Sequence, residues 1–315
     1  MKIAAVFPGQ GSQTVGMGKA LAESFQVARD VFAEVDEALS QNLSALMWDG
    51  PIDELTLTAN AQPALMAVSV AATRVLEQES GKSLAEIASY IAGHSLGEYS
   101  ALAASGTLAL SDAAKILRLR GEAMQAAVPA GQGAMAAVLG LRLEQVDEVA
   151  RQAAEDEVCE IANDNAPGQV VISGSAAAIE RAIGLAKEAG AKRSLALPVS
   201  APFHCSLMQP AAERMAEALD DLSLNALQTP LVANVLAEAY QDTAQTKDLL
   251  MRQVTGRVRW TESVQAMAGN EVSHILELGA GKVLSGLNRR IDKSLASANM
   301  ESHEQLDAVL ELLKT

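Results

Sequence analysis

Short apolar runs alternate with longer stretches of helical spacing along most of the chain. Residues 3–7 are five apolar side chains followed by Pro-Gly, which predicts a buried strand. Residues 60–79 place apolar side chains on one face of a predicted helix. A short strand at 90–92 is followed at once by a helix over 96–104. Alternation of this kind predicts parallel strands in an α/β sheet.

The middle of the chain has the element order of a smaller, separate unit. The pattern predicts strand, helix, strand, helix and strand in turn, over 133–139, 143–154, 169–173, 176–189 and 193–198. That order is typical of a ferredoxin-like α+β unit. We therefore expect two domains: an α/β core made of residues 1–127 and 199–315, and an inserted ferredoxin-like subdomain over 128–198.

Composition excludes several classes of function. Apolar residues make up 49% of the chain and aromatic residues only 3%, so the core is built from small aliphatic side chains. The formal net charge of −15 excludes the basic footprint that nucleic acid or an anionic membrane surface needs. No stretch has the length and hydrophobicity of a membrane span, and no signal peptide is apparent. We expect a cytoplasmic protein that binds neither nucleic acid nor membrane.

The cysteine and histidine contents argue against a metal or a disulfide framework. Cys159 and Cys205 are the two cysteines, too few for either a set of disulfides or a four-thiolate site. The four histidines have no metal-ligand spacing. We expect no metal and no organic cofactor.

One motif carries chemistry. Residues 93–97, GHSLG, fit G-x-S-x-G between a predicted strand and a predicted helix. In that position Ser95 lies at a tight turn and at a helix N-terminus, where N–H groups favour a developing negative charge. The alternative is an ordinary glycine-rich turn that happens to contain a serine. The structural context favours Ser95 as a nucleophile.

A serine nucleophile needs a base, and His204 is the best placed of the four histidines. It follows the inserted unit, in a segment where a loop can reach the site. His94 is next to Ser95 and is expected to point away from the hydroxyl. The alternative for His204 is a histidine bonded within its own loop. Cys205 is a weaker candidate nucleophile, because Ser95 already occupies the turn.

Arg120 lies on the apolar face of a helix predicted over 111–127. It is four residues after Ile116 and four before Met124, both apolar. An arginine that faces inward is costly unless it meets an anion. Two interpretations stay open: an internal ion pair with a carboxylate, or a bidentate fork for a substrate carboxylate.

Several short motifs occur in order along the chain: FPGQGSQ (7–13), AQPAL (61–65), GHSLGEY (93–99), RG (120–121), NAPGQVVISG (165–174), FH (203–204) and ELGAGKVL (277–284). The individual motifs are short, but their order is specific. Taken together, these segments resemble malonyl-CoA:acyl carrier protein transacylases nearly end to end.

The resemblance implies a hydrolase-like parallel-sheet core, an inserted ferredoxin-like subdomain and a site built on a Ser–His dyad. It implies that a backbone carbonyl at Gln253 orients His204, and that the backbone N–H groups of Gln10 and Leu96 bind the oxyanion. Arg120 would bind the substrate carboxylate. Asn163 and Asn165 are expected to contact the CoA or pantetheine arm. Phe203 is a bulky residue before the base, and in related polyketide acyltransferases this choice goes with malonyl over methylmalonyl units; the alternative for Phe203 is ordinary packing.

The activity implied is transfer of a malonyl group from malonyl-CoA to the pantetheine thiol of holo acyl carrier protein, in fatty acid biosynthesis. We expect a monomer. Carrier proteins are acidic, so docking needs a basic patch. The candidates are Lys187, Lys192, Arg193, Lys282, Arg289 and Arg290.

Two alternative functions stay open. A serine esterase or thioesterase of the α/β hydrolase type is one alternative, although no acid stands out to complete a triad with His204. A malonyltransferase of a polyketide pathway is another.

The segment 256–260 reads Gly-Arg-Val-Arg-Trp, where the family often has Asn-Pro-Val-x-Trp. We therefore expect the loop that supports the base to differ here.

Overall fold

Two sheets form the framework of the molecule. The computed structural model describes residues 1–199 and 201–314. The larger sheet has the strand order β10-β9-β1-β2-β7-β8, and β8 alone of these six runs antiparallel to its neighbour. Its strands are β1 (Ile3–Phe7), β2 (Tyr90–Gly93), β7 (Leu231–Val232), β8 (Ala239–Tyr240), β9 (His274–Leu278) and β10 (Ala296–Met300).

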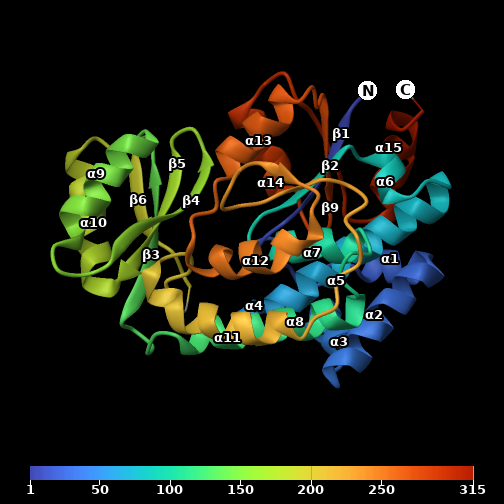
Figure 1. The fold of residues 1–315 in the computed structure, drawn as a ribbon, viewed down its shortest axis with the longest axis horizontal. Coiled ribbons are helices and arrows are strands. Elements are labelled where there is room, and N and C mark those ends of the chain that lie inside the picture. The colour runs from blue at the N-terminus through green and yellow to red at the C-terminus, as the bar shows by residue number, and fades with distance from the viewer. Residues whose placement is uncertain (200, 315) are drawn as a thin grey trace.

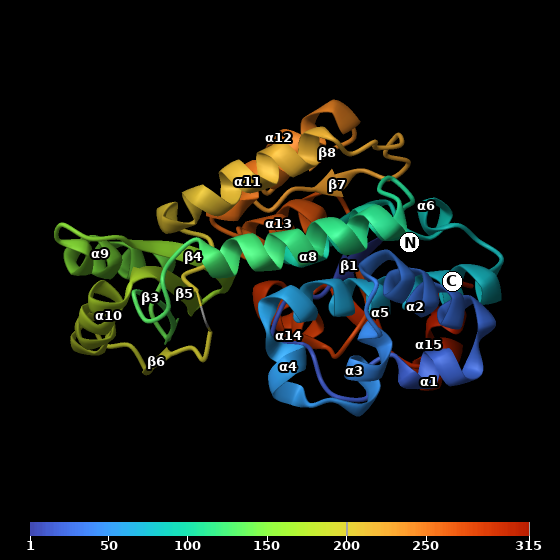
Figure 2. The same ribbon diagram turned by 90° about the horizontal axis from the view of Figure 1, so that it is seen from below.

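Helices surround this sheet and form the larger lobe in both ribbon views (Figures 1 and 2). The central helix α5 is buried nearly all round, which is typical of a helix inside a core. It packs against α2, α7 and α8. The helices of this lobe are α1 (Lys19–Ser24), α2 (Gln26–Leu39), α3 (Leu43–Asp49), α4 (Ile52–Thr56), α5 (Thr58–Ser80), α6 (Leu84–Ile87), α7 (Leu96–Ala104), α8 (Leu110–Ala126), α11 (Gln209–Asp220), α12 (Thr246–Thr255), α13 (Trp260–Gly269), α14 (Val283–Ile291) and α15 (Leu306–Leu312).

The smaller lobe is a four-stranded antiparallel sheet with two helices, seen at the left of Figure 1. Its chain order is strand, helix, strand, strand, helix, strand, and its sheet order is β4-β5-β3-β6. This is the ferredoxin-like arrangement, so the predicted fold class is confirmed. Its elements are β3 (Gly133–Leu139), α9 (Leu143–Ala154), β4 (Cys159–Ala166), β5 (Gln169–Ser175), α10 (Ala176–Glu188) and β6 (Arg193–Ala196). The exact domain limits at 128 and 198 stay a prediction.

Strand β4 is not among the elements predicted from the sequence. Its residues, CEIANDNA, are half polar, so they lack the apolar run or strict alternation of a recognisable strand. The strand lies at the sheet edge and departs twice from regular register with β5. Polar side chains are tolerated at such an edge. The prediction therefore missed the strand that faces the larger lobe.

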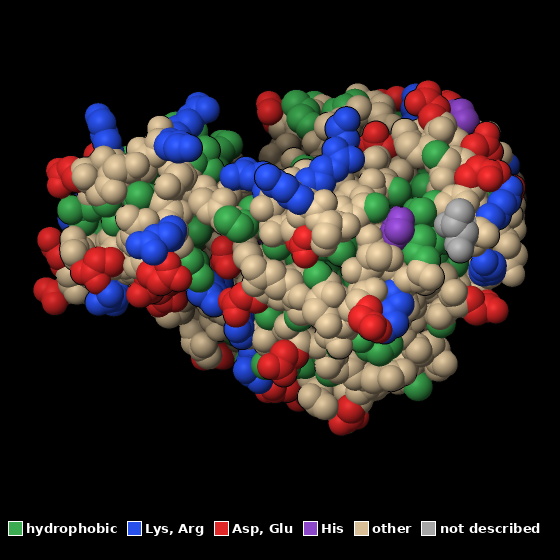
Figure 3. All heavy atoms as spheres, turned by 90° about the horizontal axis from the view of Figure 1, so that it is seen from above, with side chains coloured by type: hydrophobic (Ala, Val, Ile, Leu, Met, Phe, Trp, Pro, Cys, Tyr) green, Lys and Arg blue, Asp and Glu red, His purple; other side chains and the backbone are tan. Residues whose placement is uncertain are grey.

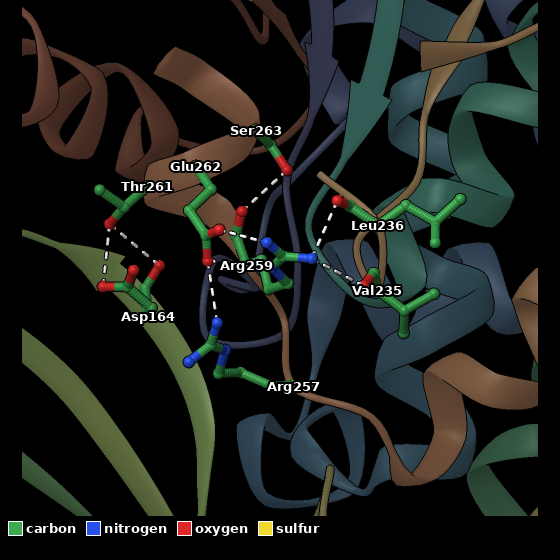
Figure 4. Close-up of polar contacts among 8 residues, drawn as sticks. All are labelled: Asp164, Val235, Leu236, Arg257, Arg259, Thr261, Glu262 and Ser263. Carbon is green, nitrogen blue, oxygen red and sulfur yellow. Dashed lines mark hydrogen bonds and ion pairs between the residues drawn. The ribbon is translucent and has the colours of Figure 1, made fainter. Parts of the chain in front are cut away.

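The two lobes are joined by backbone pairing between β4 and the segment that precedes α13. Asp164 N donates to Val258 O at 2.9 Å, and Val258 N donates to Ala162 O at 2.8 Å. Thr261 Oγ1 adds a bond of 2.9 Å to Asp164 Oδ1 (Figure 4). This pairing fixes residues 256–260, the Gly-Arg-Val-Arg-Trp segment of the sequence.

Two arginines of that segment hold it against the rest of the larger lobe (Figure 4). Arg259 Nη1 donates to Leu236 O at 2.9 Å, in the loop between β7 and β8. Arg257 and Arg259 both form ion pairs with Glu262 at the start of α13. Residues 257–259 are thus anchored to the larger lobe through charged side chains.

No helix in the described part of the chain is long and apolar enough to cross a membrane.

Candidate active site

Ser95 lies between β2 and α7, in a backbone conformation that few residues adopt. Its φ is 53° and its ψ is −110°. A side chain on either flanking glycine would collide with backbone. A Cβ on Gly93 would lie 1.9 Å from the carbonyl carbon of Gly97, and one on Gly97 would lie 2.2 Å from Phe7 O. Strain of this kind persists where surrounding contacts fix it and is common at functional sites.

Asn234 fixes that turn. Its Oδ1 accepts a hydrogen bond of 2.7 Å from Ser95 N, and its Nδ2 donates one of 2.6 Å to Gly93 O. Both ends of the amide are therefore used on the backbone around the nucleophile. Asn234 is not among the site residues predicted from the sequence. The available signal was its position just after β7, because β2 and β7 are parallel and end at the same sheet edge.

His204 is placed as a base for Ser95. Its Nε2 lies 2.8 Å from Ser95 Oγ. On the other side of the ring, Nδ1 lies 3.0 Å from Gln253 O and 3.1 Å from Gly256 O. Two carbonyl acceptors there require the proton to be on Nδ1, which leaves Nε2 free to accept one. Burial lowers the pKa of His204 to about 3, and the charge of Arg120 acts in the same direction, so the ring is neutral.

Arg120 is almost fully buried, with 1% of its surface exposed. Its guanidinium donates to Gln62 Oε1 at 2.7 Å, to Gln253 Oε1 at 2.9 Å and to Ser95 Oγ at 3.1 Å. Burial is the main cause that lowers its pKa. Among the ion pairs of the described residues, none includes Arg120. Two neutral amides, the Ser95 hydroxyl and the ring of Tyr99 therefore surround the guanidinium, with the ring centroid 5.5 Å away.

These groups open into one cavity of about 350 Å³. Ser95, His204 and Arg120 line it, and so do four other residues predicted for the site: Gln10, Leu96, Asn163 and Phe203. Leu96 is the first residue of α7, so its N–H has no acceptor within the helix. The remaining lining residues are Gly11, Gln13, Thr56, Gln62, His94, Met124, Met135, Leu197, Pro198 and Val199.

The family model described as "Acyl transferase domain" matches residues 5–304. The malonyl CoA-acyl carrier protein transacylase of Escherichia coli (strain K12) is 46% identical over 311 residues, which cover 99% of each chain. This chain belongs to the malonyl CoA-acyl carrier protein transacylase family.

Solved structures of the malonyl CoA-acyl carrier protein transacylase family have the same fold as this chain. An acyl-carrier-protein-S-malonyltransferase from Bartonella henselae is 52% identical and superposes with a TM-score of 0.98 over 100% of both chains. A type II PKS malonyl-transacylase, solved in complex with its acyl-carrier protein, is 43% identical. It superposes with a TM-score of 0.95 over 99% of this chain and 100% of that one. The chain is an acyltransferase.

Two predicted site residues do not line the cavity. Asn165 is turned to His94, with its Oδ1 2.8 Å from His94 Nε2. Gln253 lies behind the cavity and is fully buried. Its backbone carbonyl lies against His204, as predicted, and its side chain also holds Arg120. The substrate role predicted for Asn165 stays a prediction.

Three polar residues of the site's hydrogen-bond network were not predicted from the sequence: Gln62, Glu98 and Asn234. Gln62 and Glu98 both lie inside segments that carried the resemblance, but no spacing argument pointed to either. Within residues 1–199 and 201–314, no group of three or more His, Cys, Asp or Glu side chains is arranged to hold a metal ion.

Proposed function

We propose that this acyltransferase moves a malonyl group from malonyl-CoA to the pantetheine thiol of acyl carrier protein, through a malonyl ester on Ser95. The observation that carries the proposal is the contact of Ser95 Oγ with two groups at once. His204 Nε2 lies 2.8 Å away and Arg120 Nη2 lies 3.1 Å away. A base and a carboxylate-binding cation therefore meet at one nucleophile.

In the first half-reaction, Ser95 Oγ attacks the thioester carbonyl while His204 Nε2 takes the hydroxyl proton. The N–H groups of Gln10 and Leu96 bind the oxyanion of the tetrahedral intermediate. The C–S bond then breaks, and His204 returns the proton to the CoA thiolate. Gln253 O and Gly256 O stabilise the charged ring while it holds the proton, because both accept from Nδ1.

In the second half-reaction, the pantetheine thiol takes the place of CoA. His204 accepts the thiol proton as the thiolate attacks the ester carbonyl, and it returns that proton to Ser95 Oγ when the ester bond breaks. The two half-reactions share one site, so the kinetics are ping-pong. Every step uses side chains and amides of this chain, and none needs a cofactor.

Arg120 selects the malonyl group by pairing with its free carboxylate. An acetyl group offers no such partner and would leave a buried cation without an anion, which disfavours it. Asn163 and Phe203 line the same cavity, Asn163 for contact with the CoA or pantetheine arm and Phe203 beside the acyl group. Phe203 fills space where a methyl branch on the acyl chain would lie, and it excludes that branch by steric contact.

Carrier docking is proposed for a basic groove where the two lobes meet. Figure 3, which views the molecule from above, shows Lys and Arg side chains gathered along this junction. The groove has a volume of about 600 Å³, and its lining includes Arg142, Lys192, Arg193 and Arg290 but no acidic side chain. Three of these were docking candidates on the sequence alone. An acidic carrier is attracted to such a patch despite the net charge of the chain.

Charge reversal tests the docking proposal. Arg290→Glu is expected to raise the KM for acyl carrier protein several-fold and to leave the KM for malonyl-CoA unchanged. Lys19→Glu is the control, because Lys19 lies on α1 and pairs with Asp49. Equal KM values for the carrier in both variants would remove this groove from the proposal.

The esterase alternative is less well supported. A hydrolase triad needs a carboxylate at His204 Nδ1, and here two backbone carbonyls occupy that place. We propose a role in fatty acid biosynthesis; a polyketide pathway uses the same half-reactions, and the identity of the cognate carrier distinguishes the two.

We also propose that the enzyme acts as a monomer in the cytoplasm. The cavity and its hydrogen-bond network come from a single chain, so no second copy is needed to complete the site. Its two cysteines are both free and buried, which suits a reducing compartment. Sedimentation at assay concentration tests the first statement, and fractionation of the producing cell tests the second.

The decisive experiment is the intact mass of the protein after mixing with malonyl-CoA alone. A malonyl adduct on the wild type and none on Ser95→Ala is the expected result. Release of CoA without an adduct would show that water is the acceptor and would favour the esterase. If neither an adduct nor released CoA is detected, malonyl-CoA is not the donor and the proposal is overturned.

A further inference from the structure

Glu98 is a buried carboxylate at the active site to which the reaction above gives no role. It lies on the first turn of α7, three residues after Ser95, and is 0% exposed. Its Oε2 accepts two hydrogen bonds, from Gln253 Nε2 at 2.8 Å and from Asn234 N at 3.1 Å. A carboxylate in such a place is costly unless its bonds serve the fold or the site. Both of its partners belong to the network around Ser95.

The bond to Gln253 decides which way that side-chain amide points. Gln253 Nε2 donates to Glu98 Oε2 and also to Ser95 O, at 3.0 Å. Both of these oxygens are acceptors, so they bind only the NH₂ end of the amide. The carbonyl end is thereby directed to Arg120, whose Nη2 donates to Gln253 Oε1 at 2.9 Å. In the flipped orientation, the NH₂ group would face a guanidinium that also can only donate.

The same geometry couples the orientation of Arg120 to the nucleophile. The Arg120 nitrogen that Gln253 holds, Nη2, is the one that contacts Ser95 Oγ. Gln62 holds the other terminal nitrogen, Nη1, at 2.7 Å. Loss of the Gln253 contact would leave Nη2 with only its longer bond to Ser95 Oγ, so the guanidinium could turn away from the position proposed for the acyl carboxylate.

We propose that Glu98 is a positioning residue: its carboxylate fixes the orientation of the Gln253 amide, and that amide holds Arg120 against Ser95. This inference rests on the proposed malonyl transfer. Glu98 touches no substrate in this scheme. It acts as a hydrogen-bond acceptor for Gln253, which in turn holds Arg120. Its loss therefore slows transfer of acyl groups that bind Arg120 much more than transfer of acyl groups that do not.

The acceptor role differs from a charge role, and Glu98→Gln separates the two. Among the described residues, Glu98 Oε1 has no hydrogen-bond partner. A glutamine can therefore place its oxygen at the Oε2 position and its NH₂ at the Oε1 position. Glu98→Gln retains both accepted bonds without the charge, whereas Glu98→Ala removes them.

The test compares acylation of Ser95 by malonyl-CoA and by acetyl-CoA, followed by rapid quenching and intact mass. Glu98→Ala is expected to lower kcat/KM for malonyl-CoA by about tenfold to a hundredfold, and for acetyl-CoA by less than about threefold. Glu98→Gln is expected to restore the malonyl value to within about threefold of wild type. In a Gln253→Ala background, Glu98→Ala is expected to leave the malonyl-to-acetyl ratio unchanged, because its effect runs through that side chain.

Glu277→Ala is the matched control. Glu277 is also a fully buried carboxylate, but it binds the N-terminus of α14 through Leu284 N and Ser285 N and does not line the cavity. Its loss is expected to lower thermal stability and leave the malonyl-to-acetyl ratio unchanged. A shift in that ratio would show that destabilisation alone produces the effect, and would overturn the proposal.

The other outcomes are also decisive. Equal losses on both donors in folded Glu98→Ala, or full additivity with Gln253→Ala, would overturn the inference. Where Glu98→Ala does not fold, Gln253→Ala carries the test, since it keeps the carbonyl that orients His204; an unchanged ratio there overturns the inference. Wild-type protein without a malonyl adduct overturns the proposed function as well, whereas a wild-type adduct with no shift in Glu98→Ala overturns only this inference.

Discussion

Arg120 Nη2 donates a hydrogen bond to Ser95 Oγ across 3.1 Å. The cation proposed to bind the acyl carboxylate is therefore one hydrogen bond away from the proposed nucleophile. Recognition of one end of a short acyl group sets the position of the other end.

Arg120→Ala is expected to reduce malonyl transfer by about a hundredfold or more, and acetyl transfer far less, because only the malonyl group loses a charged partner. Arg120→Lys keeps the charge but not the planar fork, and an intermediate loss is expected. Steady-state rates with the two donors measure this. Equal losses for malonyl and acetyl would remove Arg120 from recognition of the carboxylate.

Asn234→Ala is expected to destabilise the protein by about 2–4 kcal/mol, because Gly93 O and Ser95 N lose their buried partner together. It is also expected to lower kcat, since the strained backbone of Ser95 loses its support. Urea unfolding and steady-state kinetics measure the two effects. Asn225→Ala, which removes one exposed bond to Gly106 O, is the control and is expected to cost less than about 1 kcal/mol. Similar losses in both variants would contradict the special role of Asn234.

The pH dependence of Ser95 acylation is expected to lack a step near the ordinary histidine pKa of 6.5. The pKa of His204 is lowered to about 3, mainly by burial, so the ring remains neutral and able to accept a proton well below pH 6. Pre-steady-state acylation is expected to change little between pH 7.5 and pH 5. A midpoint near 6.5 would show that the ring is more solvated than its burial indicates.

The contribution of Glu98 to the stability of the protein is expected to decrease as the pH rises. Burial raises the pKa of Glu98 from its ordinary value of 4.5 to about 7. Between pH 4.5 and about 7, the folded protein holds a proton that the unfolded chain has released. The contribution of Glu98 to the free energy of unfolding is therefore present at low pH and is lost as the pH rises toward 7. The change is on the order of 3 kcal/mol.

Glu98→Gln does not titrate, which makes it the reference for this effect. The stability of the variant relative to wild type is expected to increase from pH 4.5 to pH 8. Thermal unfolding of both proteins across that range is the measurement. A constant difference at every pH would mean that Glu98 ionises alike in the folded and unfolded states.

Phe203→Ala is expected to increase acylation by methylmalonyl-CoA relative to malonyl-CoA by about tenfold, because the cavity gains room for a methyl branch. Competition between the two donors, resolved by intact mass, measures the ratio. No change in the ratio would assign Phe203 to packing alone.

The parts of this molecule that the sequence could predict are those with a local signal. The strand–helix pattern and the G-x-S-x-G turn each depend on neighbouring residues, and Ser95 was located from them. Arg120 was placed on a buried helix face from its spacing to Ile116 and Met124, and its burial is confirmed.

The parts that could not be predicted depend on contacts between distant segments. Asn234 and Gln62 are ordinary amides in sequence and acquire their roles only when the sheet edge and α5 meet the nucleophile. Strand β4 was missed because Asn163 and Asp164 interrupt its apolar pattern, yet Asn163 faces the cavity and Asp164 pairs with Val258. The polar residues of β4 that contact the cavity and the larger lobe therefore also weaken the sequence pattern by which the strand could be predicted.

The active site is assembled from both halves of the chain, and this has a consequence for the newly synthesised protein. Ser95 and His204 are 109 residues apart, with the small lobe between them, and Gln253 is 158 residues beyond Ser95. A chain emerging from the ribosome therefore carries its nucleophile long before the carbonyls that orient its base. Products truncated before residue 253 hold the serine without a positioned histidine, so incomplete chains are expected not to hydrolyse malonyl-CoA during synthesis.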